Sequence, residues 1–279
     1  MMQEHRLAVT RQARYFTLGA NVPVEVWFVC HGYAQLAARF LEKFGVLDDG
    51  RRYIVAPEGL SRFYITDSPA ERRVGASWMT REDRVAEIEG YVAYLDAVYD
   101  DLFRTLDRSQ VRVHALGFSQ GAPTVSRWTA LGKAQVDRLI LWGGEFPPDL
   151  DLTSAAGVAR LRAAQLTFVY GRSDQFITPK VLAETGKRLQ AHEIPYQEIA
   201  FDGGHEIEPA VLRQLAEGRE TGGVMSAPCP SRLPSPVSRL AAVCVSHRVP
   251  EHRARHHDEH EREPRGCRDP GCVDEGIPA

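Results

Sequence analysis

A short turn in the middle of the sequence limits the possible folds more than any other segment. The apolar run Val111–Leu116 leads directly into Gly117-Phe118-Ser119-Gln120-Gly121, and helical spacing follows over Gln120–Leu131. Pro123 falls in the first turn of that predicted helix, where proline is tolerated. A G-x-S-x-G sequence between a strand and a helix is typical of a nucleophile elbow, whose glycines allow a close approach around a strained serine. The turn predicts an α/β fold and Ser119 as a nucleophile.

Apolar runs and helically spaced segments alternate along the chain. The predicted strands are Leu7–Thr10, Ala13–Leu18, Val24–Cys30, Tyr53–Ala56, Val111–Leu116, Leu139–Trp142, Leu166–Tyr170 and Tyr196–Phe201. The predicted helices are Tyr33–Phe44, Val85–Leu106, Gln120–Leu131, Pro179–His192 and Glu208–Leu215. This order favours a mostly parallel sheet covered by helices on both faces, with the first two strands as an antiparallel pair. In such sheets, functional residues gather at the carboxyl ends of the strands.

Composition changes abruptly near residue 218. Every Phe, Tyr and Trp precedes residue 202, and the sequence from Gly218 onward is rich in Pro, Arg, Ser and His. We therefore expect a folded domain over 1–217 and a mostly disordered tail over 218–279, in which Leu240–Val245 could form a short strand or helix. The tail contains four Cys but no paired C-x2-C unit, so we expect no metal site.

Bulk properties argue against several classes of protein. The chain has 279 residues, 43% of them hydrophobic and 25% charged, with a formal net charge of −3. This balance gives no basic field for nucleic acid. No apolar stretch is long enough for stable membrane insertion, and the N-terminus does not resemble a signal peptide. Cys30 is the one cysteine in the predicted domain, so a disulfide framework is not expected and a cytoplasmic location is the default.

A serine hydroxyl needs a base, and the base needs an acid that orients it. His205 follows the last predicted strand and is the best base by position, compared with His5, His31, His114 and His192. Asp174 follows the strand Leu166–Tyr170 and gives the chain order Ser, Asp, His that is typical of this kind of triad. Asp202, three residues before His205, is the rival acid.

The turn after the strand Val24–Cys30 could bind a developing oxyanion. His31-Gly32-Tyr33 ends that strand and presents free backbone N–H groups. Since an oxyanion needs two donors, we assign them to the backbone amides of Tyr33 and Gln120. His31 would be structural and hydrogen-bonded within the loop.

The connection from Glu58 to Thr80 is the longest in the predicted domain. It carries Phe63, Trp78 and Met79, which a purely solvated loop would not need. Long loops at this edge of a sheet are often functional, so these three side chains are predicted to line a substrate pocket. The alternative is that Trp78 and Met79 cover the edge of the sheet.

Four motifs, HGY, GFSQG, GRSD and GGHEI, occur in an order and spacing that resemble the carboxylesterase/lysophospholipase family, which includes the acyl-protein thioesterases. Gly75–Arg84 (GASWMTREDR) also resembles a segment of bacterial members. The resemblance covers about residues 5–217. It implies a compact α/β-hydrolase domain without a large cap, which needs no cofactor and hydrolyses short or medium acyl esters, lysophospholipids or thioesters.

The family's functional residues fall on Ser119, Asp174 and His205, with Tyr33 and Gln120 as oxyanion donors. Two differences from the family's motifs narrow the expected substrate class. The thioesterases commonly read H-G-L-G-D where this chain has His31-Gly32-Tyr33-Ala34-Gln35, and the nucleophile is Ser rather than the Cys of dienelactone hydrolases. The predicted activity is serine esterase on a small-molecule ester. The alternatives are an acyltransferase with the same triad and a non-catalytic binding protein on the same fold.

Overall fold

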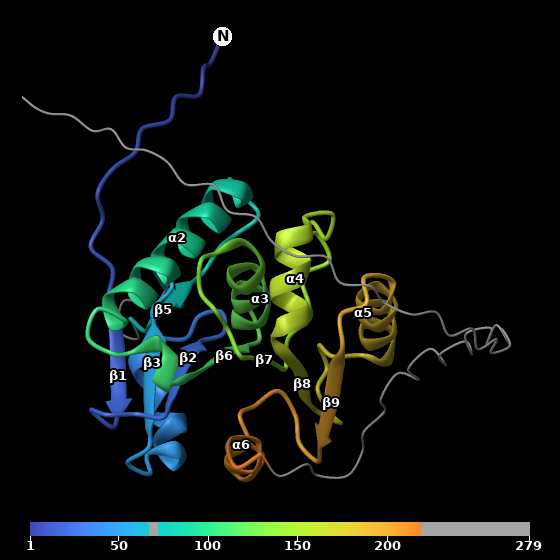
Figure 1. The fold of residues 1–279 in the computed structure, drawn as a ribbon. Coiled ribbons are helices and arrows are strands. Elements are labelled where there is room, and N and C mark those ends of the chain that lie inside the picture. Colours follow the sequence, from blue (N-terminus) through green and yellow to red (C-terminus); the bar gives the residue numbers. More distant parts are fainter. Residues whose placement is uncertain (67–71, 219–279) are drawn as a thin grey trace, which may run out of the picture. The chain divides into compact units, whose positions relative to one another are not determined.

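The computed structural model describes residues 1–66 and 72–218. Seven strands form one sheet in the order β1-β3-β2-β6-β7-β8-β9 (Figure 1). Their bounds are β1 Tyr15–Gly19, β2 Glu25–Cys30, β3 Arg52–Pro57, β6 Arg112–Phe118, β7 Arg138–Trp142, β8 Gln165–Gly171 and β9 Tyr196–Phe201. The edge strand β1 is antiparallel to β3, and every other pairing in this sheet is parallel. The predicted mostly parallel sheet is confirmed.

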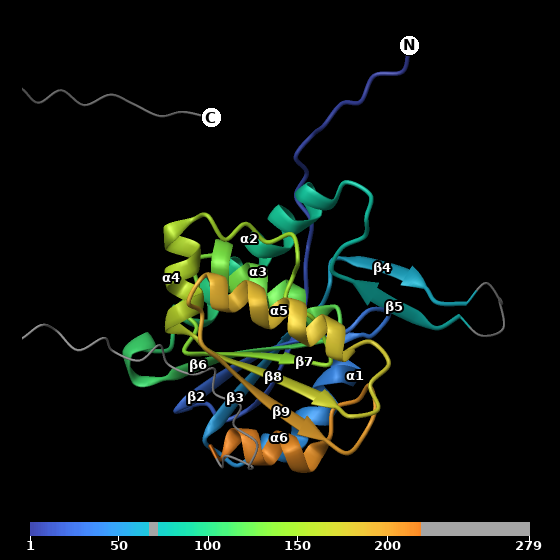
Figure 2. The same cartoon turned by 90° about the vertical axis from the view of Figure 1, so that its right-hand side faces the viewer.

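Helices cover both faces of the sheet. They are α1 Ala37–Leu41, the 3-10 helix η1 Glu42–Leu47, α2 Arg84–Leu102, the 3-10 helix η3 Arg108–Gln110, α3 Gly121–Leu131, α4 Ala155–Ala163, α5 Pro179–Ala191 and α6 Pro209–Ala216. In Figure 2, α2, α3, α4 and α5 lie above the sheet, and α1 and α6 lie below it. The central strands are apolar on both faces because both are buried, as in other parallel sheets.

Two hydrophobic clusters fill the space between the layers. Trp128 and Phe28 lie in the cluster that includes residues of α2 and α3, and Trp27 and Trp142 lie in the cluster that includes α1 and α6. All four of these side chains are fully buried. The parallel register then fixes the place of the elbow, because Cys30 lies beside Gly117 and Phe118 beside Trp142. The turns after β2, β6 and β7 therefore meet at one edge of the sheet.

Three predicted elements differ from the structure. Leu7–Thr10 is not a strand: it has no pairing, and Leu7 and Val9 are exposed. The strand predicted at Ala13–Leu18 corresponds to β1, which pairs with β3 instead. The connection read as a loop from Glu58 to Thr80 contains an antiparallel hairpin of β4 Ser61–Tyr64 and β5 Val74–Ser77.

Helix α4 was not predicted, because its sequence AAGVARLRA buries only Gly157, Val158 and Leu161. Within the described residues, the connection between β3 and β6 adds the β4–β5 hairpin, and no cap domain is present. In the same part of the chain, no helix has the length and apolar character needed to cross a bilayer. The predicted 218–279 tail, apart from Gly218, and its run Leu240–Val245 lie outside the described residues.

Candidate active site

Ser119 occupies a strained turn between β6 and α3. Its φ of 53° is in the left-handed region, which a non-glycine residue seldom adopts. A Cβ on Gly117 would lie 2.1 Å from the carbonyl oxygen of Gly121, and a Cβ on Gly121 would lie 2.1 Å from that of Cys30. Larger side chains cannot fit at either glycine, so both are required by the close approach of strand and helix. The backbone of Ser119 is also held, since its N–H donates to the carbonyl oxygen of Trp142 at 2.9 Å.

His205 and Asp174 form a hydrogen-bonded pair at the same edge. The distance from Nδ1 of His205 to Oδ2 of Asp174 is 2.8 Å. The Asp174 side chain is fully buried, whereas the His205 side chain is 22% exposed. The other carboxylate oxygen, Oδ1, accepts the backbone N–H of Phe176 at 2.9 Å. Since the carboxylate holds Nδ1, the Nε2 atom of His205 is the one available for proton transfer.

The rival acid has a different partner. Asp202 is 96% exposed at its side chain, and its Oδ1 lies 3.2 Å from Nε of Arg172. The structure therefore brings Asp174, and not Asp202, to His205.

Two glycines and one phenylalanine place this pair beside the elbow. A Cβ on Gly143 would lie 3.2 Å from both Asp174 Oδ2 and His205 Nδ1, and a Cβ on Gly144 would lie 2.4 Å from the Ser119 carbonyl oxygen. The ring of Phe118, the residue before the serine, is 4.8 Å from the His205 ring. Among the described residues, Ser119 Oγ and His205 are not hydrogen-bonded, as is common when substrate is absent.

The sequence prediction missed Gly143 and Gly144, although a Gly-Gly pair directly after a buried strand at this edge is a readable signal. It also missed Phe176, whose ring lies edge-on to His205 at 4.7 Å. No periodic pattern marks Phe176, because it lies in the irregular segment between β8 and α5.

The two predicted oxyanion donors have free backbone N–H groups. Within residues 1–66 and 72–218, no acceptor is paired with the backbone N–H of Tyr33 or of Gln120. A Cβ on Gly32 would lie 3.2 Å from Ser119 Cβ, so the loop that carries Tyr33 reaches the serine. The two amides thus lie on the loops that meet at the candidate nucleophile, as an oxyanion site would require.

His31 is structural, as predicted. Its Nε2 accepts the backbone N–H of Gly59 at 2.9 Å, so Nδ1 carries the proton and donates to the carbonyl oxygen of Gly32 at 2.8 Å. Burial lowers the pKa of His31. A neutral imidazole therefore supports the turn that presents Tyr33.

The predicted pocket residues divide into two groups. Trp78 is 2% exposed and its indole N–H donates to the His31 carbonyl oxygen at 2.8 Å, which favours the packing alternative for this residue. Met79 is partly buried, and its carbonyl oxygen accepts Nε2 of Gln120 at 2.8 Å. Phe63 is half-buried on β4 and stacks on Tyr33 with ring centroids 5.2 Å apart. Of the three, Phe63 is the side chain best placed to meet a substrate.

Comparison with solved structures identifies the fold. An acyl-protein thioesterase 2 from Zea mays matches with a TM-score of 0.56 and 16% identity over 74% of this chain and 97% of that one. A carboxylesterase from Mesorhizobium loti matches with a TM-score of 0.58 and 19% identity, over 74% and 95% of the two chains. The Bacillus cereus carboxylesterase gives a TM-score of 0.55 and 13% identity, over 74% and 92%.

No protein-family model matches this sequence, and no curated protein matches it. The structural similarities show that the chain has an α/β-hydrolase fold. The solved structures that share this fold with it include carboxylesterases and an acyl-protein thioesterase.

Proposed function

We propose that this chain is a serine hydrolase that cleaves carboxylic esters through an acyl-enzyme intermediate. The observation that carries the proposal is the position of His205 and the buried Asp174, whose nearest atoms are 2.8 Å apart, beside the strained and glycine-framed Ser119. An α/β fold alone would not support it, since one fold serves many functions. Binding proteins do not need a histidine held by a sealed carboxylate beside a strained serine.

In the proposed acylation step, Nε2 of His205 removes the proton of Ser119 as Oγ bonds to the ester carbonyl carbon. The carbonyl oxygen becomes an oxyanion and accepts the backbone N–H groups of Tyr33 and Gln120. Asp174 stabilises the imidazolium through Nδ1 and keeps the ring oriented. When the tetrahedral species collapses, the bond to the alcohol oxygen breaks, and Nε2–H of His205 protonates the departing alcohol.

Deacylation repeats the same steps with water. His205 removes a proton from the water, the new oxyanion occupies the same two donors, and Ser119 Oγ leaves with the proton from His205. An alcohol in place of water would give a new ester, which is the acyltransferase alternative. The chain's own groups complete every step.

The test is a series of p-nitrophenyl esters of increasing acyl length, assayed with wild type and with Ser119→Ala. We expect turnover by wild type and a loss of at least about a thousandfold in kcat in the variant, since triad members contribute several powers of ten. Product analysis with water and a primary alcohol as competing acceptors separates hydrolysis from transfer. A wild-type chain that turns over no ester or thioester would contradict the proposal.

A further inference from the structure

A cavity of about 220 Å³ lies beside the candidate oxyanion loop, between α1–η1 and the β4–β5 hairpin. Figure 2 shows the hairpin and α1 on the side toward which the arrowheads of β8 and β9 point. The hairpin is held against the loop by a backbone bridge between Gln35 and Ala76. Its own strands are fixed near the cavity because the N–H of Ile65 donates to the carbonyl oxygen of Arg73 at 2.8 Å.

Three cations line this cavity, and no acidic side chain of the described residues does. Arg39 and Lys43 are four residues apart on the continuous α1–η1 segment, which places them on one face. Arg73 faces them from the hairpin. Within the described part of the chain, none of the three forms an ion pair, although the formal net charge of the whole protein is −3.

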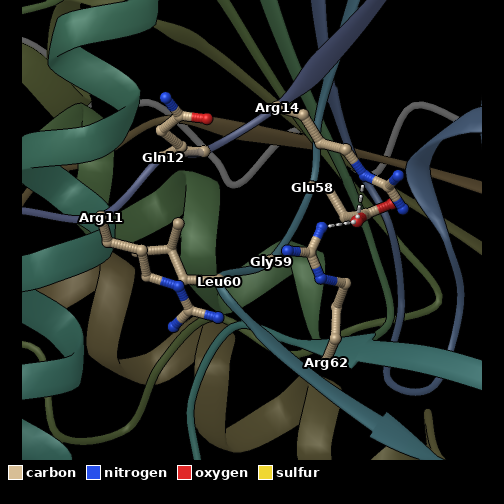
Figure 3. Close-up of a pocket in the computed structure, with 8 residues that line it drawn as sticks. Arg11, Gln12, Arg14, Glu58, Gly59, Leu60 and Arg62 are labelled. Carbon is tan, nitrogen blue, oxygen red and sulfur yellow. Dashed lines mark hydrogen bonds and ion pairs between the residues drawn. The ribbon is translucent and has the colours of Figure 1, made fainter.

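A neighbouring arginine cluster shows the contrasting case. In Figure 3, Arg14 and Arg62 both point to Glu58, at distances of 2.8 and 3.3 Å. The Glu58 side chain is 1% exposed and offsets one of the two positive charges from within the cluster. No such carboxylate of the described chain reaches Arg39, Lys43 and Arg73, so their charge is available to a ligand.

Gln35 connects the cavity to the loop beside the candidate nucleophile. Gln35 lines the cavity, and its Oε1 accepts the backbone N–H of Gly32 at 2.9 Å. A Cβ on Gly32 would lie 3.3 Å from that Oε1 and 3.2 Å from Ser119 Cβ. The loop that contacts Ser119 therefore also borders the cavity through Gln35, on the side toward which a substrate bound at Ser119 would extend.

The remaining walls are apolar. Leu36 and Phe40 come from the loop and α1, and Ile65 and Val74 come from the hairpin. Ile65 and Val74 are 40% and 36% exposed. Apolar side chains this exposed add little to the stability of the fold. A short hydrocarbon chain that ends in a negative charge matches this combination of apolar walls and cations.

We infer that this cavity binds an anionic group of the ester substrate, a carboxylate or a phosphate, separated from the scissile carbonyl by a short hydrocarbon chain. The inference rests on the proposed ester hydrolysis and specifies its substrate class. The cations hold the anion, and the apolar side chains contact the linker. Because the cations are exposed, their effect falls on substrate capture and is screened by salt.

The test compares matched charged and neutral esters. Mono-p-nitrophenyl glutarate is paired with p-nitrophenyl pentanoate, and 2-phosphoethyl pentanoate with 2-hydroxyethyl pentanoate. We expect kcat/KM to be about tenfold higher for the charged member of at least one pair, as for an interaction of about 1.4 kcal/mol. A preference in one pair identifies the anion as carboxylate or phosphate. About 0.5 M sodium chloride should reduce the preference severalfold.

The variants are Arg39→Gln/Lys43→Gln and, separately, Arg73→Gln on the hairpin. Each should raise KM for the charged ester and leave kcat/KM for its neutral partner unchanged. The control matched to the double variant, Lys187→Gln/Arg213→Gln, removes the same two positive charges at exposed positions of α5 and α6. Equal kcat/KM in both pairs, or a preference that survives both variants, overturns this inference alone. A wild type that hydrolyses none of the four esters but does hydrolyse other p-nitrophenyl esters also overturns it, and inactivity on every ester overturns the proposed function.

Discussion

The Asp174 carboxylate is sealed from solvent, while the His205 ring that it contacts at 2.8 Å keeps 22% of its side chain exposed. This difference gives each group a defined task. A buried carboxylate with both oxygens hydrogen-bonded is held in place, so it fixes the imidazole by Nδ1. The partly exposed ring leaves Nε2 to face a substrate.

The first prediction separates the two candidate acids. Asp174→Asn should lower kcat by about a thousandfold or more, because the amide favours the wrong tautomer of His205. Asp202→Asn should change kcat by less than about threefold, because Asp202 pairs with Arg172 at the surface. Steady-state kinetics on one p-nitrophenyl ester measures both. The opposite ranking would move the acid to Asp202.

A second prediction concerns acid stability. His114 is buried and stacked on Trp27 at 4.5 Å, and burial lowers its pKa to about 4. Because the unfolded chain binds this proton near pH 6.5, the folded state loses stability as the pH falls from about 6.5 to 4. His114 alone accounts for roughly 2 kcal/mol of that loss at about pH 4.5.

His114→Phe keeps the stacking and removes the titrating group. Among the described residues, neither ring nitrogen of His114 has a hydrogen-bond partner, so the variant leaves no acceptor or donor unpaired. Chemical denaturation at several pH values should show a smaller loss of stability on acidification than in wild type. An unchanged pH dependence would show that His114 does not titrate as a buried group.

The third prediction concerns the support behind the oxyanion loop. The Glu58 carboxylate accepts hydrogen bonds from Arg14 and Arg62 (Figure 3). It also accepts the backbone N–H of Ala37 at 3.3 Å and so joins three segments. Glu58→Ala should lower stability by roughly 1–3 kcal/mol, since it leaves this amide unpaired and both arginines are partly exposed. The exposed Glu42→Ala is the matched control and should change little. Equal melting temperatures for both variants would contradict the supporting role.

The fourth prediction separates packing from substrate contact. Trp78→Ala should destabilise the fold by about 3–5 kcal/mol, because Trp78 is fully packed and hydrogen-bonded. It should leave the ranking of kcat/KM across acyl lengths unchanged. Phe63→Ala should change the ranking of kcat/KM across acyl lengths and have little effect on stability. Phe63 is half-buried beside Tyr33, and a methylene contact with substrate is worth about 1–3 kcal/mol. Melting curves and a short- and a medium-chain ester measure both effects, and an exchange of these two results would reject the assignment.

The groups of the candidate site could be predicted because each follows a strong local signal. Ser119 comes directly after β6, Asp174 and His205 lie in the short turns after β8 and β9, and parallel strands bring their carboxyl ends to one edge. The hairpin was not predicted, since β4 and β5 have four residues each and β4 alternates between half-buried and exposed positions. The false strand at Leu7–Thr10 has a different cause: its apolar residues suggest a strand, but Leu7 and Val9 are exposed, so no packing stabilises one there.

Helix α4 shows a further limit of prediction from the sequence. Its buried residues are few and include Gly157, so the hydrophobic period is faint. The readable signal is Ser154, whose side chain accepts the N–H of Gly157 as an N-cap. The cation-lined cavity could not be predicted from the sequence, for another reason. Arg39 and Arg73 lie far apart in sequence, and only the bridge between Gln35 and Ala76 brings their segments together.

The most direct test of the central claim is the site of covalent labelling by a fluorophosphonate, whose phosphorus is attacked by an activated serine oxygen with loss of fluoride, which leaves a phosphonylated serine. The account predicts stoichiometric labelling of the wild-type chain, mapped by mass spectrometry to Ser119, and rapid loss of ester hydrolysis in step with it. Ser119→Ala should take up no label, whereas Ser126→Ala, which changes a buried serine of the following helix α3, should be labelled at Ser119 as in wild type. Labelling at another serine, or no labelling of a folded wild-type chain, would contradict the account.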